Sequence, residues 1–414
     1  MSTLHIVGAG MAGLSTAVFA AGARVVLYEA AGQAGGRCRS YYDATLDCLI
    51  DNGNHLVLSG NPSVRDYLAA IGADHALTGP ERAEFNFLDI RSNERWTIRP
   101  NDGPLPWWIF AGDRRVPGTS PIDYARLAAL MAAGPAACIE DMIPCKGALW
   151  ERLMRPLLLA ALNTEPEKAS AALAGTVLRE TLAKGGRAYR PRIATPNLAA
   201  AFVEPALRTL TAKSAMVHFG QRIRRIIFDE NNVLALEFPE NTVPVSPDDT
   251  VVLAVPPWVA SDLIPGLETP NEFRSIVNAH FKIAAPVGAP AMLGVIGGTA
   301  EWIFAFPDRI SVTVSAADGI VDKDRESLAQ LLWADVWRAL SLSPMLPPWQ
   351  IVKEKRATFA ATPEQAARRP GMKTAWRNLL LAGDWTDTHL PATIESALRS
   401  GRKAAQLAQA RVAV

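Results

Sequence analysis

The residues best suited to chemistry lie near the start of the chain, in a glycine-rich turn followed by an acid. The apolar residues 4–7 lead into Gly8, Gly10 and Gly13, and Glu29 ends a second apolar run. Gly8 allows a tight turn, Gly10 lets phosphate approach the backbone, and Gly13 lets a helix lie close to the strand. Free N–H groups at the start of that helix attract a pyrophosphate. The spacing therefore predicts a dinucleotide-binding turn.

The acidic residue narrows the choice of nucleotide. Glu29 stands about 20 residues after the first glycine, where a carboxylate accepts hydrogen bonds from adenosine ribose hydroxyls and repels a phosphate on them. A chance glycine-rich turn is the alternative, but strand, helix, second strand and acid occur in the expected order. The turn alone does not distinguish NAD from FAD. The pair Gly35-Gly36 followed by Arg37 favours FAD, and the position of Arg37 near the expected pyrophosphate favours binding over an ordinary surface cation.

A second candidate site lies near the carboxyl terminus. The apolar run 379–382 ends at Gly383 and Asp384, and a helical pattern begins about Thr393 and Ile394. A carboxylate here would accept hydrogen bonds from a ribityl chain. The helix amino terminus would face the flavin pyrimidine, where negative charge accumulates on reduction. The alternative is that Asp384 only caps a turn.

Composition excludes several classes of function. The 414 residues are 49% hydrophobic and 20% charged, which is typical of an ordered globular protein. Basic and acidic residues number 42 and 41, a net charge of +1, so we expect no nucleic-acid partner. The four cysteines have neither C-x-x-C spacing nor paired histidines nearby. We therefore expect no metal site and no redox pair.

The predicted location is the cytoplasm. The first apolar strand starts at the third residue, which leaves no room for a signal peptide ahead of it. The longest uncharged apolar stretch in the middle, residues 127–139, is shorter than a membrane span. Unpaired cysteines are typical of a reducing compartment. Peripheral attachment to the inner face of the cytoplasmic membrane stays open.

Changes of pattern along the chain predict an α/β protein with two domains. The nucleotide-binding domain is expected to be discontinuous and to contain residues 1–75, 191–264 and 371–414. An inserted α+β substrate-binding domain is expected to contain residues 76–190 and 265–370. In the inserted domain, the patterns predict helices at 121–143, 149–162 and 325–340, and strands at 84–90, 95–98, 277–283, 291–296, 302–306 and 311–316. Elsewhere they predict a hairpin over 216–237 with its turn at 229–232, a strand at 250–255 and a last helix at 391–410.

The two ends of the chain together resemble the FAD-dependent amine oxidase and carotenoid desaturase superfamily. The glycine turn, the G-G-R loop and the late G-D segment all have counterparts there. The resemblance implies FAD as cofactor and a Rossmann-like FAD-binding domain of the GR2 type. It also implies that Arg37 sits over the phosphates and flavin, that Asp384 binds the ribityl chain and that the backbone of Ile223 meets adenine. The residues expected to contact FAD are Gly8, Ala9, Gly10, Met11, Ala12, Gly13, Glu29, Ala30, Gly36, Arg37, Gly53, Asn54, His55, Ile223, Gly383, Asp384, Thr393 and Ile394.

A narrower resemblance is to the squalene-associated FAD-dependent desaturases, which are understood as hydroxysqualene dehydroxylases. It rests on residues 51–55 (DNGNH), 156–164 (PLLLAALNT) and 383–397, which contain GDWTDT and PATIESA. His389 and Ser396 stand where glycine is expected in relatives. The resemblance implies a lipophilic isoprenoid alcohol as substrate, which loses its hydroxyl as water and takes up hydride from reduced FAD.

Such a reaction needs a general acid. His55 and His389 lie on segments expected near the flavin, and a histidine there would be able to deliver a proton. His55 is the predicted catalytic residue, although it would alternatively contact only the cofactor or the backbone. The other histidines lack a convergent partner and are expected to be structural: His5, His75, His218 and His280.

Other functions stay open at this point. An oxidase or desaturase would remove hydride from an amine, porphyrinogen or polyene, whereas a non-catalytic prenyl-lipid escort of similar fold would bind no flavin. Residues 106–110 (PWWIF), followed by Arg114-Arg115, are predicted to dip into a membrane interface, with core packing of the aromatic residues as the alternative. Upstream enzymes of squalene biosynthesis are candidate partners.

Overall fold

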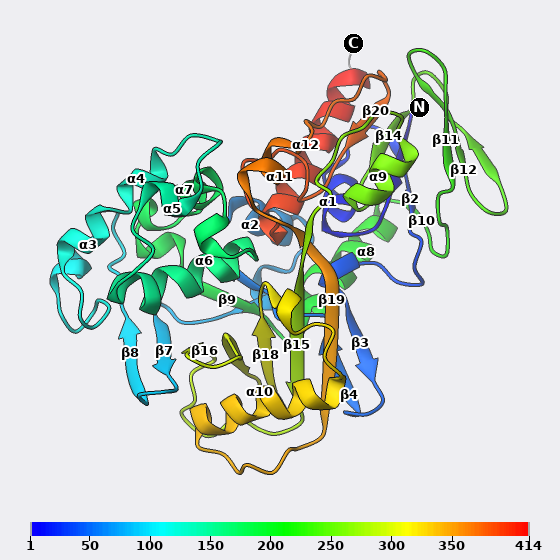
Figure 1. Ribbon diagram of the computed structural model, residues 1–414. Helices are drawn as coiled ribbons and strands as arrows, with labels where there is room; N and C mark the ends of the chain where they lie inside the picture. Colours follow the sequence, from blue (N-terminus) through cyan, green and yellow to red (C-terminus); the bar gives the residue numbers. More distant parts are fainter. Residues whose placement is uncertain (1, 413–414) are drawn as a thin grey trace.

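The structure, a computed structural model, describes residues 2–412 and contains two large sheets with helices packed on them (Figure 1). The first sheet has five parallel strands, which in spatial order are β10 (Met216–His218), β2 (Arg24–Tyr28), β1 (Thr3–Val7), β14 (Thr250–Leu253) and β20 (Leu379–Leu381). Parallel sheets are covered on both faces, which explains why most of these strands are short apolar runs. This sheet confirms the predicted Rossmann-like α/β class.

The two ends of the chain meet on the first sheet. Helix α1 (Met11–Phe19) follows β1 and packs against α12 (Ile394–Val412), which follows β20. A Cβ on Gly401 would lie 2.1 Å from the Ala12 carbonyl oxygen, so the helices approach as closely as glycine allows. The predicted last helix is therefore confirmed and lies directly against the helix of the glycine turn. Two further helices pack on α1, namely α2 (Pro62–Ala70) and α8 (Glu204–Ala212).

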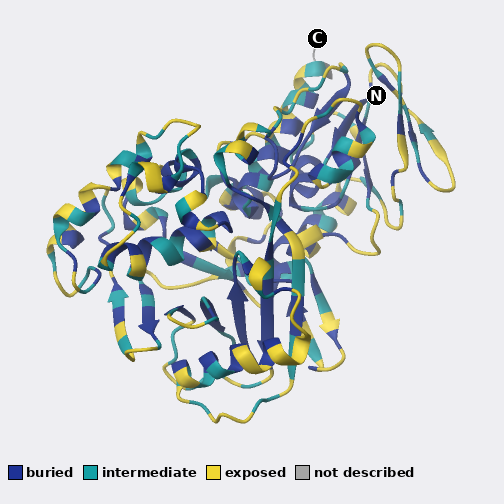
Figure 2. Cartoon of the chain, in the orientation of Figure 1, coloured by how far each residue is buried: buried dark blue, intermediate teal, exposed yellow. Residues whose placement is uncertain are grey.

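The second sheet has seven strands, in the spatial order β19 (Trp349–Phe359), β15 (Phe273–Phe281), β18 (Ile310–Val314), β17 (Trp302–Ala305), β16 (Met292–Ile296), β7 (Phe85–Asp89) and β8 (Glu94–Ile98). Its neighbouring strands are antiparallel, except β16 and β7. Helix α10 (Arg325–Leu340) covers one face with buried apolar side chains (Figures 1 and 2). The strands and the helix predicted for this region are confirmed. The apolar pattern does not predict β19, because its centre is the charged run 353–356 (KEKR).

Shorter helices lie against the opposite face of the second sheet. They are α3 (Pro121–Ala125), α4 (Ala128–Met131), α5 (Ile139–Met142), α6 (Arg155–Leu162) and α7 (Ala171–Glu180). The helix predicted over 121–143 is wrong as a continuous element. Gly134 and Pro135 interrupt the pattern, and proline lacks the amide donor that a helix interior needs. The helix predicted at 149–162 is confirmed, with a wider turn at Trp150–Met154 that runs into α6.

Within the described residues, the fold also contains three small sheets and two further short helices. The sheets are β3 (Ser40–Asp43) with β4 (Cys48–Asp51); β5 (Leu56–Leu58), β9 (Pro191–Ala194) and β6 (Leu77–Thr78); and β11 (Arg225–Phe228), β12 (Val233–Glu237) and β13 (Thr242–Pro244). The helices are α9 (Pro257–Leu263) and α11 (Pro363–Ala367). The predicted hairpin and its turn at 229–232 are confirmed for 225–237, whereas the first part of that range is β10 and pairs with β2.

The predicted division into two domains stays a prediction, because short elements connect the segments. The β3–β4 hairpin belongs to the segment 1–75, yet Leu46 and Ile50 pack against Val352 of β19. Strand β9 pairs with both β5 and β6. The loop that follows β4 therefore runs between the two large sheets.

Candidate functional site

The glycine turn lies at the carboxyl end of β1, where α1 begins. Gly8 has a φ of +104°, a conformation that other residues rarely adopt, and Gly10 precedes the first residue of α1. A Cβ on Gly13 would lie 1.8 Å from the Gly8 carbonyl oxygen, so the helix packs on the turn only with glycine there. A Cβ on Gly10 would meet no atom of the described residues within 4 Å. The turn therefore has the backbone shape and the open side that a pyrophosphate needs.

Glu29 follows β2 and faces the glycine turn. Its carboxylate accepts hydrogen bonds from the backbone N–H groups of Ala9 and Ala31, at 2.7 and 2.8 Å. A carboxylate has about four lone-pair sites, so acceptor capacity remains for ribose hydroxyls. The Glu29 carbonyl also accepts a hydrogen bond from the Gln221 N–H at 2.8 Å. That bond ties the segment leading to the buried Ile223 to the acid.

Arg37 and Asp384 come from opposite ends of the chain and form an ion pair. One guanidinium nitrogen of Arg37 lies 2.7 Å from each carboxylate oxygen of Asp384, and another donates to the carbonyl of Ala357 in β19. The backbone N–H of Gly35 donates to the Ala9 carbonyl at 2.8 Å and holds the G-G-R loop against the glycine turn. The sequence places both charged residues on one cofactor but does not predict their contact.

A buried arginine supports the turn after β20, and sequence reasoning missed it. Nη2 of Arg369 donates to the Asp384 carbonyl and to the Thr388 hydroxyl, each at 3.2 Å, and also to the Thr386 carbonyl. Burial lowers the pKa of Arg369 to about 10. The hydroxyl of Ser396, where glycine is expected in relatives, lies 2.6 Å from that of Thr388. The serine therefore supports the same turn.

Helix α12 begins beside Asp384. The Thr393 hydroxyl accepts a hydrogen bond from the Ser396 N–H at 3.1 Å, so Thr393 caps the helix, whose first residue is Ile394. The amino terminus of a helix this long attracts negative charge. The His389 side chain is 82% exposed and pairs with Asp387 at 3.2 Å. His389 therefore faces solvent, and the structure does not support it as a proton donor.

The loop 51–55 is held from both sides. On the side of the first sheet, the Leu198 N–H donates to the Asp51 carboxylate at 2.9 Å. On the side of the second sheet, Nε2 of His280 lies 3.0 Å from the Asp51 carbonyl. The last three residues of the loop are Gly53, Asn54 and His55, all predicted to contact the cofactor.

His55, the predicted catalytic residue, is half-buried at the end of this loop. Burial lowers the pKa of its ring to about 4, and the charge of Arg37 acts in the same direction. The ring is therefore neutral at neutral pH. In this state His55 is able to hydrogen-bond a cofactor or substrate through one N–H and one ring nitrogen, but it lacks the acidic proton of a charged imidazolium.

The residues brought together here fit FAD. The glycine turn and the start of α1 would hold the pyrophosphate, and Asp384 and the start of α12 lie where a ribityl chain and a flavin are expected. Asn54 adds a buried side-chain oxygen that has no hydrogen-bond partner among the described residues. No group of metal-ligating side chains occurs within residues 2–412.

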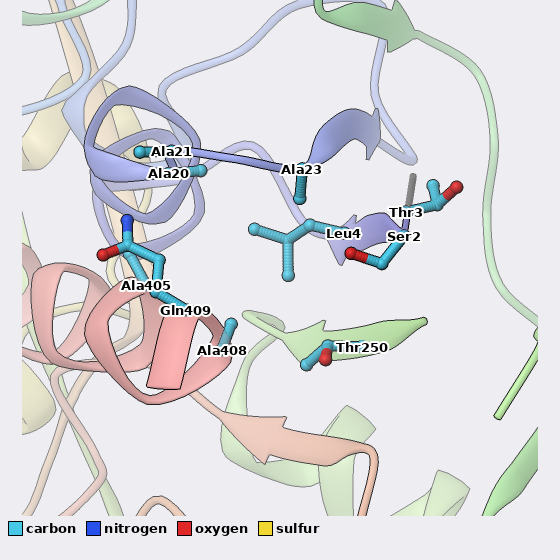
Figure 3. A pocket seen from close by; sticks show the side chains of 10 residues that line it. All are labelled: Ser2, Thr3, Leu4, Ala20, Ala21, Ala23, Thr250, Ala405, Ala408 and Gln409. Atoms are coloured by element: carbon cyan, nitrogen blue, oxygen red, sulfur yellow. The ribbon is translucent and has the colours of Figure 1, made fainter. Parts of the chain in front are cut away.

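A small hollow elsewhere on the first sheet is not part of this site. It lies at the start of β1 and β14, the ends opposite to the glycine turn, and small side chains of α12 border it (Figure 3). Its lining includes Leu4, Ala23, Thr250, Ala405 and Ala408. Because ligands of parallel α/β sheets bind at the carboxyl ends of the strands, this hollow carries no argument for function.

Comparisons with known proteins agree with this geometry. The sequence model of the flavin-containing amine oxidoreductase family matches residues 11–408. The chain is 54% identical over 408 residues to the hydroxysqualene dehydroxylase of Rhodopseudomonas palustris, and 52% identical over 407 residues to that of Sinorhizobium fredii; each match covers 98% of both proteins.

Solved structures show the same fold at low sequence identity. Cyclohexylamine oxidase from Brevibacterium oxydans is similar with a TM-score of 0.74 at 14% identity, covering 99% of both chains. An oxidoreductase from Methanosarcina mazei is similar with a TM-score of 0.72 at 12% identity, covering 98% of this chain and all of the other. The fold, the cofactor-shaped site and the sequence relatives agree. The chain therefore belongs to the flavin-containing amine oxidoreductase family, in the group of the hydroxysqualene dehydroxylases, and FAD is its cofactor.

Proposed function

We propose that the protein removes the hydroxyl group of hydroxysqualene and replaces it with hydrogen to give squalene. The observation that carries this proposal is the 54% identity to a hydroxysqualene dehydroxylase over 98% of both chains. In the proposed step a proton and the hydroxyl leave as water, the C–O bond breaks, and hydride forms the new C–H bond. FAD in its reduced form, when bound, supplies that hydride.

The residues of the site would bind and orient the cofactor. The glycine turn would hold the pyrophosphate and Glu29 the adenosine ribose, while Arg37 and Asp384 would exchange part of their mutual contact for the phosphates and the ribityl chain. The capped start of α12 at Thr393 would stabilise negative charge on the flavin ring.

The face of the second sheet that points away from α10 carries buried aromatic side chains. Phe87, Trp302 and Phe304 are buried there, and the Phe87 and Trp302 rings meet edge to face at 5.6 Å between centroids. We propose that apolar side chains of this face border the hydrocarbon chain of the isoprenoid. They would also exclude water from an allylic cation formed when the hydroxyl leaves.

Two residues are candidates for the proton donor. His55 has the predicted position, but with a pKa of about 4 it would be neutral at neutral pH. Burial raises the pKa of Glu301 to about 7, so this carboxyl would be protonated in part of the molecules. Its carboxylate accepts a hydrogen bond from the Ser315 N–H at 2.8 Å. Ser315 lies two residues along the chain from Thr313, which contacts Asn54 of the loop 51–55.

The activity is tested with the holoprotein reduced chemically in the absence of oxygen and supplied with hydroxysqualene. Squalene should appear as reducing equivalents are consumed. An oxidase or desaturase would instead reduce oxidised flavin when given its substrate, and an escort protein would purify without a flavin spectrum. Unchanged hydroxysqualene with the flavin fully reduced would reject the proposed substrate and leave the cofactor assignment standing.

Substrate supply suggests a contact with the membrane surface, at what we call the apolar tip. It consists of Leu105, Trp107, Phe110 and Ile122, whose side chains are 53% to 79% exposed. The tip lies around α3, at the end of the group of short helices (Figure 1). The Arg114 guanidinium lies 4.6 Å from the centroid of the Trp107 ring. Trp108 and Ile109 are buried. In the segment 106–110, some apolar side chains thus pack in the core and others lie on the surface.

We propose that the apolar tip inserts shallowly into a bilayer, with Arg114 placed against anionic headgroups. Among residues 2–412 no helix is long and apolar enough to span a membrane. Upstream enzymes of squalene biosynthesis would release the lipophilic substrate at the same surface.

Flotation with anionic vesicles tests the apolar tip. The double variant Trp107→Ser/Phe110→Ser should float several-fold less than the unchanged protein. The control, Val287→Ser/Met345→Ser, removes two exposed apolar side chains elsewhere and should float normally. Equal flotation of both double variants would reject the tip as the contact surface.

A further inference from the structure

We infer that Thr313 and Asn278, on neighbouring strands of the second sheet, are positioning residues that aim the side-chain oxygen of Asn54 at the reacting groups. The inference rests on the proposed function, because it assigns Asn54 a place beside the flavin. It explains why Asn278 and Thr313 are buried polar residues on the sheet face that also carries His280 and Ser311.

The cluster is a chain of four side-chain and backbone groups. Nδ2 of Asn54 lies 3.1 Å from the Thr313 hydroxyl, that hydroxyl lies 2.8 Å from Oδ1 of Asn278, and Nδ2 of Asn278 lies 3.4 Å from the Asn52 carbonyl. Asn278 is 2% exposed and Thr313 is 9% exposed. A Cβ on Gly53 would lie 3.0 Å from Nδ2 of Asn278, so the loop rests directly on this side chain.

The direction of every hydrogen bond in the chain follows from its last member. The Asn52 carbonyl only accepts, so the amide nitrogen of Asn278 must face it and the amide oxygen must face Thr313. The Thr313 hydroxyl then donates its single hydrogen to that oxygen and accepts from the next group. Only the amide nitrogen of Asn54 is able to donate to it. The Val312 carbonyl, 3.5 Å from the same nitrogen, favours the same orientation.

The orientation leaves Oδ1 of Asn54 as a buried acceptor without a partner among the described residues. A buried acceptor is costly to leave unpaired, so a bound group that carries an N–H or O–H donor would relieve this cost. The flavin of a reduced cofactor and the alcohol of the proposed substrate both carry such a donor. Thr313 contacts Asn54 in this chain of hydrogen bonds and acts through it.

The test compares Thr313→Val with Thr313→Ser in the full-length holoprotein. Valine keeps the shape but removes the hydroxyl, so Asn54 loses its fixed orientation, whereas serine keeps the hydroxyl. A matched control is Thr97→Val, because Thr97 of β8 donates to Asn86 of β7 at 3.0 Å at the other edge of the same sheet. Thermal unfolding of all three variants reports any loss of folding.

We expect Thr313→Val to weaken FAD binding or turnover about tenfold and, where the flavin is the donor, to shift the flavin midpoint potential, which is measured without substrate. Thr313→Ser and Thr97→Val should stay within about twofold of the unchanged protein, with its potential. A changed potential would mean that the flavin donates the hydrogen bond to Oδ1 of Asn54. A lower kcat at an unchanged potential would mean that the substrate donates it. The inference would be overturned if Thr313→Val had the same FAD binding, potential and turnover as Thr97→Val. It would also be overturned if Thr313→Val and Thr313→Ser were equally impaired. Because binding and potential are read without hydroxysqualene, a wrong substrate assignment would not be mistaken for either result.

Discussion

The glycine turn at residues 8–13 and the loop at residues 51–55 border the same site but are held in place differently. The turn depends on missing side chains, because a Cβ on Gly13 would overlap the Gly8 carbonyl. The loop depends on side chains that are distant in sequence, such as His280, whose ring reaches its backbone. The turn is thus a local steric device and the loop a long-range polar one, so they should fail differently when altered.

The largest effect is expected in the turn. Gly13→Val would place side-chain atoms inside the Gly8 carbonyl, so helix α1 cannot pack, and we expect no folded, flavin-binding protein. Gly10→Ala meets no described atom and has a φ of −73°, so the fold should survive. It should nevertheless bind FAD more weakly, because the new methyl group meets the phosphates. Thermal unfolding with and without FAD measures both effects, and a stable Gly13→Val protein would contradict the steric account.

The next effect concerns the ion pair that closes the site between the chain ends. Asp384→Asn removes the charge that faces Arg37, and we expect FAD to bind roughly 10- to 100-fold more weakly. The control Asp66→Asn removes a carboxylate that pairs with Arg402 away from the site. Fluorescence titration with FAD checks both variants, and equal affinities would show that the Arg37–Asp384 pair does not contribute to binding.

A smaller effect, on protein stability, is expected at Glu301, which directly precedes β17 in the second sheet, the sheet whose side chains hold the loop 51–55. Burial raises the pKa of this carboxyl from 4.5 to about 7 in the folded protein. Folding therefore favours the protonated form, whose stabilising contribution is complete below pH 4.5 and is lost as the pH rises through 7. Glu301→Gln should be more stable than the unchanged protein at pH 8, by no more than about 3 kcal/mol, and equally stable near pH 4.5. Denaturant unfolding at both pH values measures this difference, which would be absent if Glu301 were charged when folded.

If Glu301 also donates the proton, Glu301→Gln loses most of the activity, and the rate of the unchanged protein falls above pH 7. His55→Gln provides the comparison at the predicted position. Full activity of Glu301→Gln would reject Glu301 as the proton donor.

The smallest effect is expected at His280, which ties the loop 51–55 to β15. Burial lowers the pKa of this ring to about 4, so it stays neutral. His280→Gln keeps a donor for the Asp51 carbonyl, and FAD affinity should change by less than about fivefold. The dependence of binding on pH between 5.5 and 8 should be the same in both proteins. A change in that dependence would mean that the histidine titrates in this range.

The parts of the site predicted from sequence are those that depend on local geometry. The glycine spacing, the position of Glu29 and the apolar parallel strands follow from steric rules within a short stretch of chain. Asp384 was predictable for a related reason, because an acid at a strand end before a helix start suits a flavin. The family resemblance then joined the two ends of the chain.

The parts that were not predicted depend on partners far along the chain. Arg369 supports the turn after β20 through carbonyl groups, which every residue possesses, so no residue type marks it in advance. The contact of Thr313 with Asn54 joins strands whose pairing is unknown before folding. Strand β19 was missed because an edge strand tolerates the charges of residues 353–356. The broken helix over 121–143 shows that Gly134 and Pro135 outweigh an apolar pattern.

The packing of α1 against α12 has a consequence for biosynthesis. The ribosome delivers the glycine turn long before Asp384 and α12. The nascent chain therefore carries only half of its cofactor site until α12 has emerged. A chain that is released before Asp384 lacks the partner of Arg37, and cofactor loading becomes a check that synthesis has passed this point.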